Sequence, residues 1–201
     1  HRNESLVIFG DYDVDGVTST ALLIEVLRAL GWKVHHYLPH RMDEGYGLSQ
    51  EAVETCLERF PVTLLLAVDC GSTAVATIAS LRQRGVDVIV LDHHQVSSPA
   101  PAATALVNPQ LALAPAVPDH PPASTPPVSP AQSPNSCNPG NPSNSCNFAR
   151  PLTELCSAGL AFKLAHALVK RGRETGLAGA AELDLRPLLD LVALATIADI
   201  V

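Results

Sequence analysis

Short apolar runs alternate with longer, more polar stretches along the first half of the chain. The apolar runs predict β-strands, and the stretches between them predict helices. The predicted strands cover residues 5–10, 33–38, 63–69 and 86–91. The predicted helices cover residues 17–30, 50–59 and 74–84. Repeated strand–helix–strand units with short links imply right-handed crossovers, so the pattern predicts an α/β fold, a parallel β-sheet flanked by helices.

The alternation stops at about Ser97. Residues 97–150 hold most of the 17 prolines of the chain, together with many Ser, Asn and Ala residues and almost no charge. Such a segment buries too little apolar surface to offset the entropy of ordering it. We therefore expect a long, flexible, low-complexity insertion, with one exception at 105–109, where a short strand and turn are predicted.

Helical periodicity returns after the insertion. Apolar residues at helical spacing predict a largely buried helix over 155–169 and a second apolar helix over 188–201. We expect residues 1–96 and 151–201 to form two parts of one domain, separated by the insertion at 97–150.

Composition narrows the class of protein. Hydrophobic residues make up 47% of the 201 residues, which supports a folded core. No apolar run reaches the length of a membrane span, and the five cysteines contain no CxxC pair. Free thiols in a reducing cytoplasm are expected. The net charge of −7 counts only weakly against a phosphate-bearing substrate, because acids concentrate in the motifs described next.

Acidic residues and histidines follow three of the predicted strands directly. They are Asp11, Asp13 and Asp15 after the first strand, Asp69 after the third, and Asp92, His93 and His94 after the fourth. The carboxyl ends of parallel strands share one edge of the sheet, where ligands bind in such folds. Five carboxylates gathered there would repel one another unless divalent cations lay between them. The pattern therefore predicts a metal site, and one with two ions.

Each motif taken alone is also compatible with a simpler role. A calcium-binding loop starting at Asp11 would need Glu at its twelfth position, which is Leu22. Asp11, Asp13 and Asp15 could also form a solvated acidic turn, and Asp69 could merely cap a helix. The convergence of the motifs on one edge argues against these alternatives.

The expected ligands indicate the chemistry. Carboxylate and imidazole ligands suit Mn²⁺ or Mg²⁺, and a pair of such ions promotes phosphoryl-group hydrolysis. No Walker loop and no GxGxxG motif is present, so nucleotide-driven work and hydride transfer are not indicated. Helix starts at 16–19 and at Gly71-Ser72-Thr73 could hold phosphate oxygens. A purely capping role for Thr18 and Thr73 is equally open.

The motifs, in this order, resemble those of the DHH phosphoesterase superfamily. Within it the chain is similar to the RecJ branch, the single-strand-specific 5′→3′ DNA exonucleases. The segments that carry the resemblance are 10–19, 39–48, Val68-Asp69-Cys70-Gly71, Leu91-Asp92-His93-His94, 155–164 and 195–201.

The resemblance implies a metal-dependent phosphodiesterase with two Mn²⁺ or Mg²⁺ ions. It implies that Asp13 and Asp69 bind one ion, with Asp11 beside it. The implied ligands of the second ion are Asp15, Asp69, His93 and Asp199. Asp69 and Asp11 are thus expected to serve catalysis as well as metal binding.

The resemblance also implies contacts to a DNA substrate. His94 is expected to contact the scissile phosphate or to assist the leaving group, and is the third predicted catalytic residue. Arg41, Ser72 and Thr73 are further predicted substrate contacts, although Arg41 could equally be an exposed surface charge. Single-stranded DNA is the expected partner. A single-stranded-DNA-binding protein or a helicase is a further expectation, through domains that the chain lacks.

Some positions differ from the family pattern. Phe9 stands where some relatives have a metal-binding histidine, and Ala195 where relatives often have glycine. The sequence begins almost at once with a strand and ends two residues after Asp199, which suggests part of a longer protein. We therefore expect the chain to bind metal but to be a poor nuclease alone.

Two competing functions remain open from the sequence. One is a DHH phosphoesterase acting on short RNA or cyclic dinucleotides; Tyr12 replaces the proline typical of those relatives and argues against it. The other is a non-enzymatic scaffold that has lost its ligands, whereas here every motif acid and both histidines are present.

Overall fold

The core of the protein is a five-stranded parallel sheet. The structure is a computed structural model that describes residues 5–113 and 154–200. Its strands are β1 (Leu6–Gly10), β2 (Val34–Tyr37), β3 (Leu64–Val68), β4 (Asp87–Leu91) and β5 (Ala105–Val107). They pair in parallel in the order β2-β1-β3-β4-β5. The predicted α/β fold is confirmed, and the predicted short strand at 105–109 adds β5 to the edge of the sheet.

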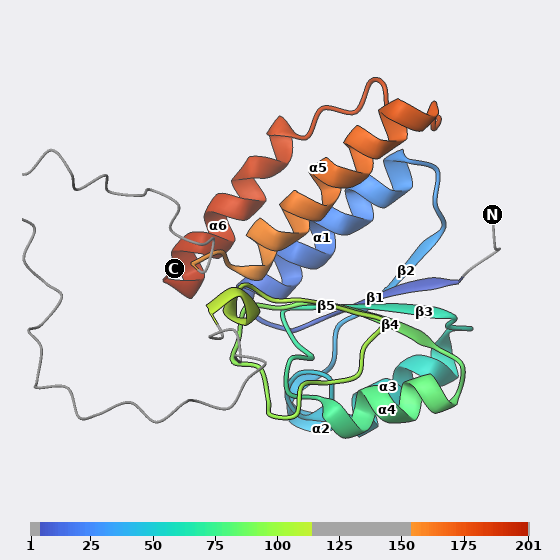
Figure 1. The fold of residues 1–201 in the computed structure, drawn as a ribbon, viewed down its shortest axis with the longest axis vertical. Helices are drawn as coiled ribbons and strands as arrows, with labels where there is room; N and C mark the ends of the chain where they lie inside the picture. The colour runs from blue at the N-terminus through green and yellow to red at the C-terminus, as the bar shows by residue number, and fades with distance from the viewer. Residues whose placement is uncertain (1–4, 114–153, 201) are drawn as a thin grey trace, which may run out of the picture.

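Helices cover both faces of the sheet (Figure 1). One layer contains α1 (Val14–Ala29), α5 (Ser157–Thr175) and α6 (Leu189–Asp199). The other contains α2 (Arg41–Glu44), α3 (Gln50–Arg59) and α4 (Val75–Gln83). Two short 3₁₀ helices cover Pro109–Leu113 and Arg186–Leu188.

Each face of the sheet has its own apolar core, because alternate residues of a strand point to opposite faces. Ile8 and Leu66 pack toward α1 and α5, whereas Val7 and Leu65 pack toward α3 and α4. All four are at most 4% exposed. Burial on both sides explains why these strands are apolar without interruption.

Several helix boundaries differ from the predictions. Helix α1 begins at Val14 rather than at residue 17, because Asp13 acts as its N-cap and accepts a hydrogen bond from the Gly16 amide at 2.9 Å. Helix α5 continues to Thr175 rather than 169 and ends at Gly176, whose φ is 69°. The short helix α2 was not predicted. Ser49 caps α3, and its hydroxyl accepts a hydrogen bond from the Ala52 amide at 3.1 Å.

The strand order places the site. After β1 the chain passes through α1 on one face of the sheet to β2, whereas after β3 it passes through α4 on the other face to β4 (Figure 1). The switch point therefore lies between the carboxyl ends of β1 and β3, where such sheets form a crevice. Residues 114–150 of the predicted insertion lie outside the described residues, and the predicted domain boundaries remain a prediction. Among the described helices, none is long and apolar enough to cross a membrane.

Candidate metal centre

The turn after β1 carries the first group of acids. Asp11 follows the strand directly and is fully buried, Asp13 caps α1, and Asp15 lies in the first turn of that helix. Gly16 is required here, because a Cβ at this position would lie 2.5 Å from the Asp11 carbonyl oxygen. The tight turn brings all three carboxylates to the carboxyl edge of the sheet.

Asp69 occupies the corresponding position after β3. Its backbone has a φ of 61°, a left-handed conformation that is uncommon for a residue other than glycine. Such a conformation costs about 1–3 kcal/mol and is found mostly at functional sites. The Asp69 amide donates to the Leu91 carbonyl at 2.9 Å, and the side chain is only 1% exposed.

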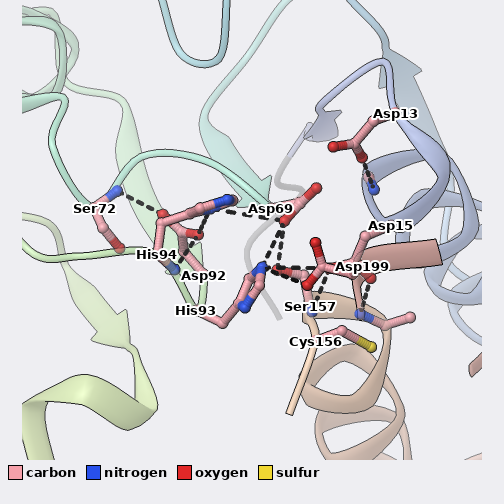
Figure 2. Close-up of polar contacts among 12 residues, drawn as sticks. Asp13, Asp15, Asp69, Ser72, Asp92, His93, His94, Cys156, Ser157 and Asp199 are labelled. Atoms are coloured by element: carbon pink, nitrogen blue, oxygen red, sulfur yellow. Dashed lines mark hydrogen bonds and ion pairs between the residues drawn. The ribbon is translucent and has the colours of Figure 1, made fainter. Parts of the chain in front are cut away.

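The two histidines after β4 have different surroundings (Figure 2). His93 Nε2 lies 3.8, 3.5 and 3.3 Å from carboxylate oxygens of Asp15, Asp69 and Asp199, respectively. His94 Nδ1 lies 2.8 Å from Asp92 Oδ1, and its side chain is 43% exposed. His93 therefore faces the cluster of acids, whereas His94 is fixed by Asp92 at the rim.

The second part of the chain completes the cluster. Asp199 is the last residue of α6. A carboxylate at this position faces the negative end of the helix dipole, which makes a nearby cation more favourable. At the start of α5, the amides of Ser157 and Ala158 donate to the two oxygens of Asp15 at 2.6 and 2.8 Å.

The positions of the donor atoms fit a pair of divalent cations. Three overlapping groups each have ligand atoms within 4.8 Å of one another: Asp11, Asp13 and Asp69; Asp15, His93 and Asp199; and Asp69, His93 and His94. Four buried atoms in these groups have no hydrogen-bond partner, namely Asp11 Oδ2, Asp69 Oδ2, His93 Nε2 and Asp199 Oδ2. Buried polar atoms without partners are costly in a folded protein. Coordination of a cation would satisfy them.

The pKa values indicate how crowded the negative charge is without a cation. Burial, together with the charges of Asp15 and Asp13, raises the pKa of Asp69 to about 8. Burial also raises the pKa of Asp11. The hydrogen bond to Asp92 raises the pKa of His94 to about 9. For Asp92 burial acts in the opposite direction, but its hydrogen bonds from His94 and Ser72 outweigh it and lower its pKa to about 2. A divalent cation would replace the proton that Asp69 otherwise retains at neutral pH.

The other predicted substrate contacts differ in their exposure and in the hydrogen bonds that they already make. Arg41 is exposed on α2, and its guanidinium lies 5.0 Å from the centre of the Tyr12 ring, beside the acidic turn. Thr73 is exposed before α4. Ser72 is 1% exposed, and its amide and hydroxyl already pair with Asp92 and Asn108. The roles of these three residues stay predictions.

One prediction about the helix starts is wrong. The 16–19 segment does not open α1, because that helix begins at Val14. Thr18 lies in its second turn, where the hydroxyl donates to the Val14 carbonyl at 2.7 Å. The cap is supplied by Asp13 instead. The Phe9 side chain is fully buried and stacks on Tyr37 at 5.5 Å, within the core on the α3 side.

Sequence reasoning counted Asp92 among the acids of the metal site, whereas it belongs to none of the three groups of ligand atoms, and two further residues that hold the site together were missed. Ser157 donates from its hydroxyl to Asp69 Oδ1 at 3.0 Å. Asp92 orients His94, and Asn108 bonds both Ser72 and the His94 carbonyl at 2.8 Å. Ser157 is the first residue of α5 and does not cap it, and its partner, 88 residues away in the chain, has no local signature.

Fold and site together define a doubly wound α/β protein with a centre of carboxylates and imidazoles at the switch point of its sheet. The model of the DHH family, N-terminal domain, matches residues 5–196. The chain belongs to this family.

Relatives with similar sequences are named RecJ, after one branch of the family. The single-stranded-DNA-specific exonuclease RecJ of Dickeya dadantii is 36% identical over 99% of this chain. RecJ of Bacillus subtilis is 34% identical over 100% of it. The chain spans 29% and 20% of the lengths of these two relatives.

A solved structure is similar as well. The crystal structure of an exonuclease RecJ bound to manganese matches 99% of this chain and 40% of its own, with 33% identity and a TM-score of 0.67.

Proposed function

We propose that this chain is the metal-binding part of a RecJ-type exonuclease, which hydrolyses phosphodiester bonds of single-stranded DNA from the 5′ end. The observation that supports the proposal most strongly is the convergence of four buried ligand atoms, without hydrogen-bond partners, from separate segments of the chain. The similarity to RecJ relatives and to a manganese-bound RecJ structure supports the choice of substrate and of Mn²⁺ or Mg²⁺.

Two groups of residues would each hold one divalent ion. One ion would be held by Asp11, Asp13 and Asp69, and the other by Asp15, Asp69, His93 and Asp199, so that Asp69 is shared. Divalent ions at such a centre activate water and neutralise charge on the phosphoryl group. Burial prevents the carboxylates of Asp11, Asp15 and Asp69 from turning into solvent, so they hold their charge at a fixed place.

His94 is the proposed contact to the scissile phosphate or the leaving group. Asp92 holds its Nδ1 at 2.8 Å, which leaves Nε2 for the substrate. Its 43% exposed side chain is accessible to DNA, unlike that of His93, which is 12% exposed. Arg41, beside the acidic turn, would contact a neighbouring phosphate.

Further parts of the proposal concern partners and location. A single-stranded-DNA-binding protein or a helicase would interact through segments that the relatives have beyond the length matched here. A cytoplasmic location agrees with the described cysteines Cys56, Cys70 and Cys156, which are free and buried.

A substrate panel tests the proposal. The chain is titrated with Mn²⁺ by calorimetry and then incubated, at high protein concentration, with 5′-labelled single-stranded DNA, short RNA and a cyclic dinucleotide. We expect binding of two ions and slow removal of nucleotides from the 5′ end of the DNA. Preferred cleavage of short RNA or of the cyclic dinucleotide would instead indicate a DHH phosphoesterase that acts on such small substrates. Absence of Mn²⁺ binding would refute the proposal altogether, and rapid processive digestion would refute the expectation of weak activity alone.

A further inference from the structure

The first turn of α5 contacts the candidate metal ligands without supplying one. Ser157 is fully buried, and its backbone amide donates to Asp15 while its hydroxyl donates to Asp69 (Figure 2). One residue thus bonds two carboxylates that belong to different strand ends. His93 Nε2 also faces both carboxylates, at 3.8 and 3.5 Å, but makes no hydrogen bond to either.

The bond to Asp69 determines which of its oxygens remains available. The Ser157 hydroxyl occupies Oδ1 at 3.0 Å, whereas Oδ2 is buried and has no partner. Asp69 is 1% exposed, so bulk solvent does not reach Oδ2. Without the hydroxyl, the Asp69 carboxylate could rotate about its Cβ–Cγ bond. Oδ2 would then no longer point toward the position of the cation.

The hydrogen bonds to Asp15 also fix the orientation of a carboxylate. Both of its oxygens accept backbone amides, from Ser157 and Ala158, at 2.6 and 2.8 Å. The positive end of the α5 dipole adds to this attraction. The Asp15 carboxylate is therefore fixed in orientation before any cation arrives.

The same turn is also attached to the helix that carries Asp199. Cys156 Sγ lies 3.6 Å from Thr196 Oγ1, and Cys156, Ala158 and Ala195 form a small buried cluster. The start of α5 thus bonds Asp15 and Asp69 directly and is linked to Asp199 through α6.

We infer that Ser157 is a positioning residue of the metal centre: its hydroxyl orients the shared carboxylate of Asp69, and the α5 turn around it sets the spacing of Asp15, Asp69 and Asp199. The inference rests on the proposed function, because it assumes that these carboxylates bind divalent cations. Hydrogen-bond partners of metal ligands commonly contribute about 10–100-fold to metal affinity.

The test compares Ser157→Ala with the wild-type chain by Mn²⁺ calorimetry. The variant retains the backbone amides that hold Asp15 and removes only the bond to Asp69. We expect at least one Mn²⁺ ion to bind about 10–100-fold more weakly. Ser19→Ala is the matched control, because Ser19 is equally buried on α1 but its hydroxyl has no partner. Mn²⁺ affinity should be unchanged in this control.

A conservative variant separates positioning from simple packing. Ser157→Thr keeps the hydroxyl and should restore most of the affinity, whereas Ser157→Cys offers only a weak donor and should restore little. Thermal melting without metal reports separately whether each variant folds. If Ser157→Ala does not fold, Ser157→Cys takes its place in the comparison with wild type. If Ser157→Ala melts at a lower temperature yet binds Mn²⁺ as tightly as wild type, Ser157 is merely structural and the inference is wrong. If the wild-type chain itself binds no Mn²⁺, the proposed function fails first.

Discussion

The two sides of the candidate metal centre are built in opposite ways. On the inner side, Asp15 and Asp69 are at most 2% exposed and are held by the first turn of α5. On the outer side, the proposed substrate contacts His94 and Arg41 are exposed. The inner side has the fixed geometry that metal ligands need, and the outer side has the access that a nucleic-acid substrate needs. The difference suggests that metal binding and substrate binding can be impaired separately.

Loss of the shared ligand should have the largest effect. Asp69→Asn removes the negative charge from the residue that is common to two of the three groups of ligand atoms. We expect more than about a 100-fold loss of Mn²⁺ affinity, beyond the usual effect of an outer partner, and no detectable hydrolysis. Calorimetry and a single-stranded-DNA assay measure the two effects. Retention of two tightly bound ions would show that Asp69 is not shared.

Replacement of the outer histidine should separate the two sides. His94→Gln removes the group that is proposed to contact the substrate, and such groups typically contribute about 100-fold or more to the rate. We expect a loss of this order in the rate at saturating DNA, with Mn²⁺ affinity little changed. His93→Gln is the comparison, since His93 faces three acids and its replacement should weaken metal binding. Equal effects of both variants on Mn²⁺ affinity would contradict the division into two sides.

One group from each side, Asp69 from the inner and His94 from the outer, should make the metal-free protein sensitive to alkaline pH. The pKa of Asp69 is raised from 3.8 to about 8 and that of His94 from 6.5 to about 9, so both groups favour the folded state in their protonated forms. Their contributions are complete below the unfolded pKa values and are lost as pH rises through 8 and 9. Asp92, with its pKa lowered to about 2, adds stability that is lost only in strong acid.

Melting in EDTA at pH 6 and pH 9 measures this effect. We expect Tm to fall by on the order of 5 °C between the two, since 1 kcal/mol shifts Tm by about 2–4 °C for a chain of this size. Saturating Mg²⁺ should reduce the fall, and Asp69→Asn should reduce it without metal. A Tm that rises with pH in EDTA would contradict the signs of these shifts.

The smallest effect is expected for the exposed cation. Arg41→Gln removes a charge beside the acidic turn, and exposed ion pairs contribute about 1 kcal/mol or less. We expect KM for single-stranded DNA to rise up to about fivefold, with less difference at high salt. Lys33→Gln, at another exposed basic residue, serves as the control. An unchanged KM at low salt would leave Arg41 as a surface charge only.

The sequence by itself determined the parallel sheet and the strand ends at which the acids gather. Apolar runs ended by Asp11, Asp69 and Asp92 are local patterns, and parallel strands necessarily bring their carboxyl ends to one edge. Repulsion among the carboxylates gathered there then predicted a cation between them, whichever way the helices packed.

Only the tertiary structure decided how those acids are oriented. The hydrogen bond from Ser157 to Asp69 joins residues 88 positions apart in the chain. The surroundings of His93 and His94 differ because the His93 ring turns toward the metal-site acids, whereas the His94 ring turns toward Asp92. Hydrogen bonds between distant segments arise from packing and leave no periodicity in the chain. The start of α1 differs from its prediction for a related reason: the pattern marks Asp13 as a ligand, although the same carboxylate also caps the helix.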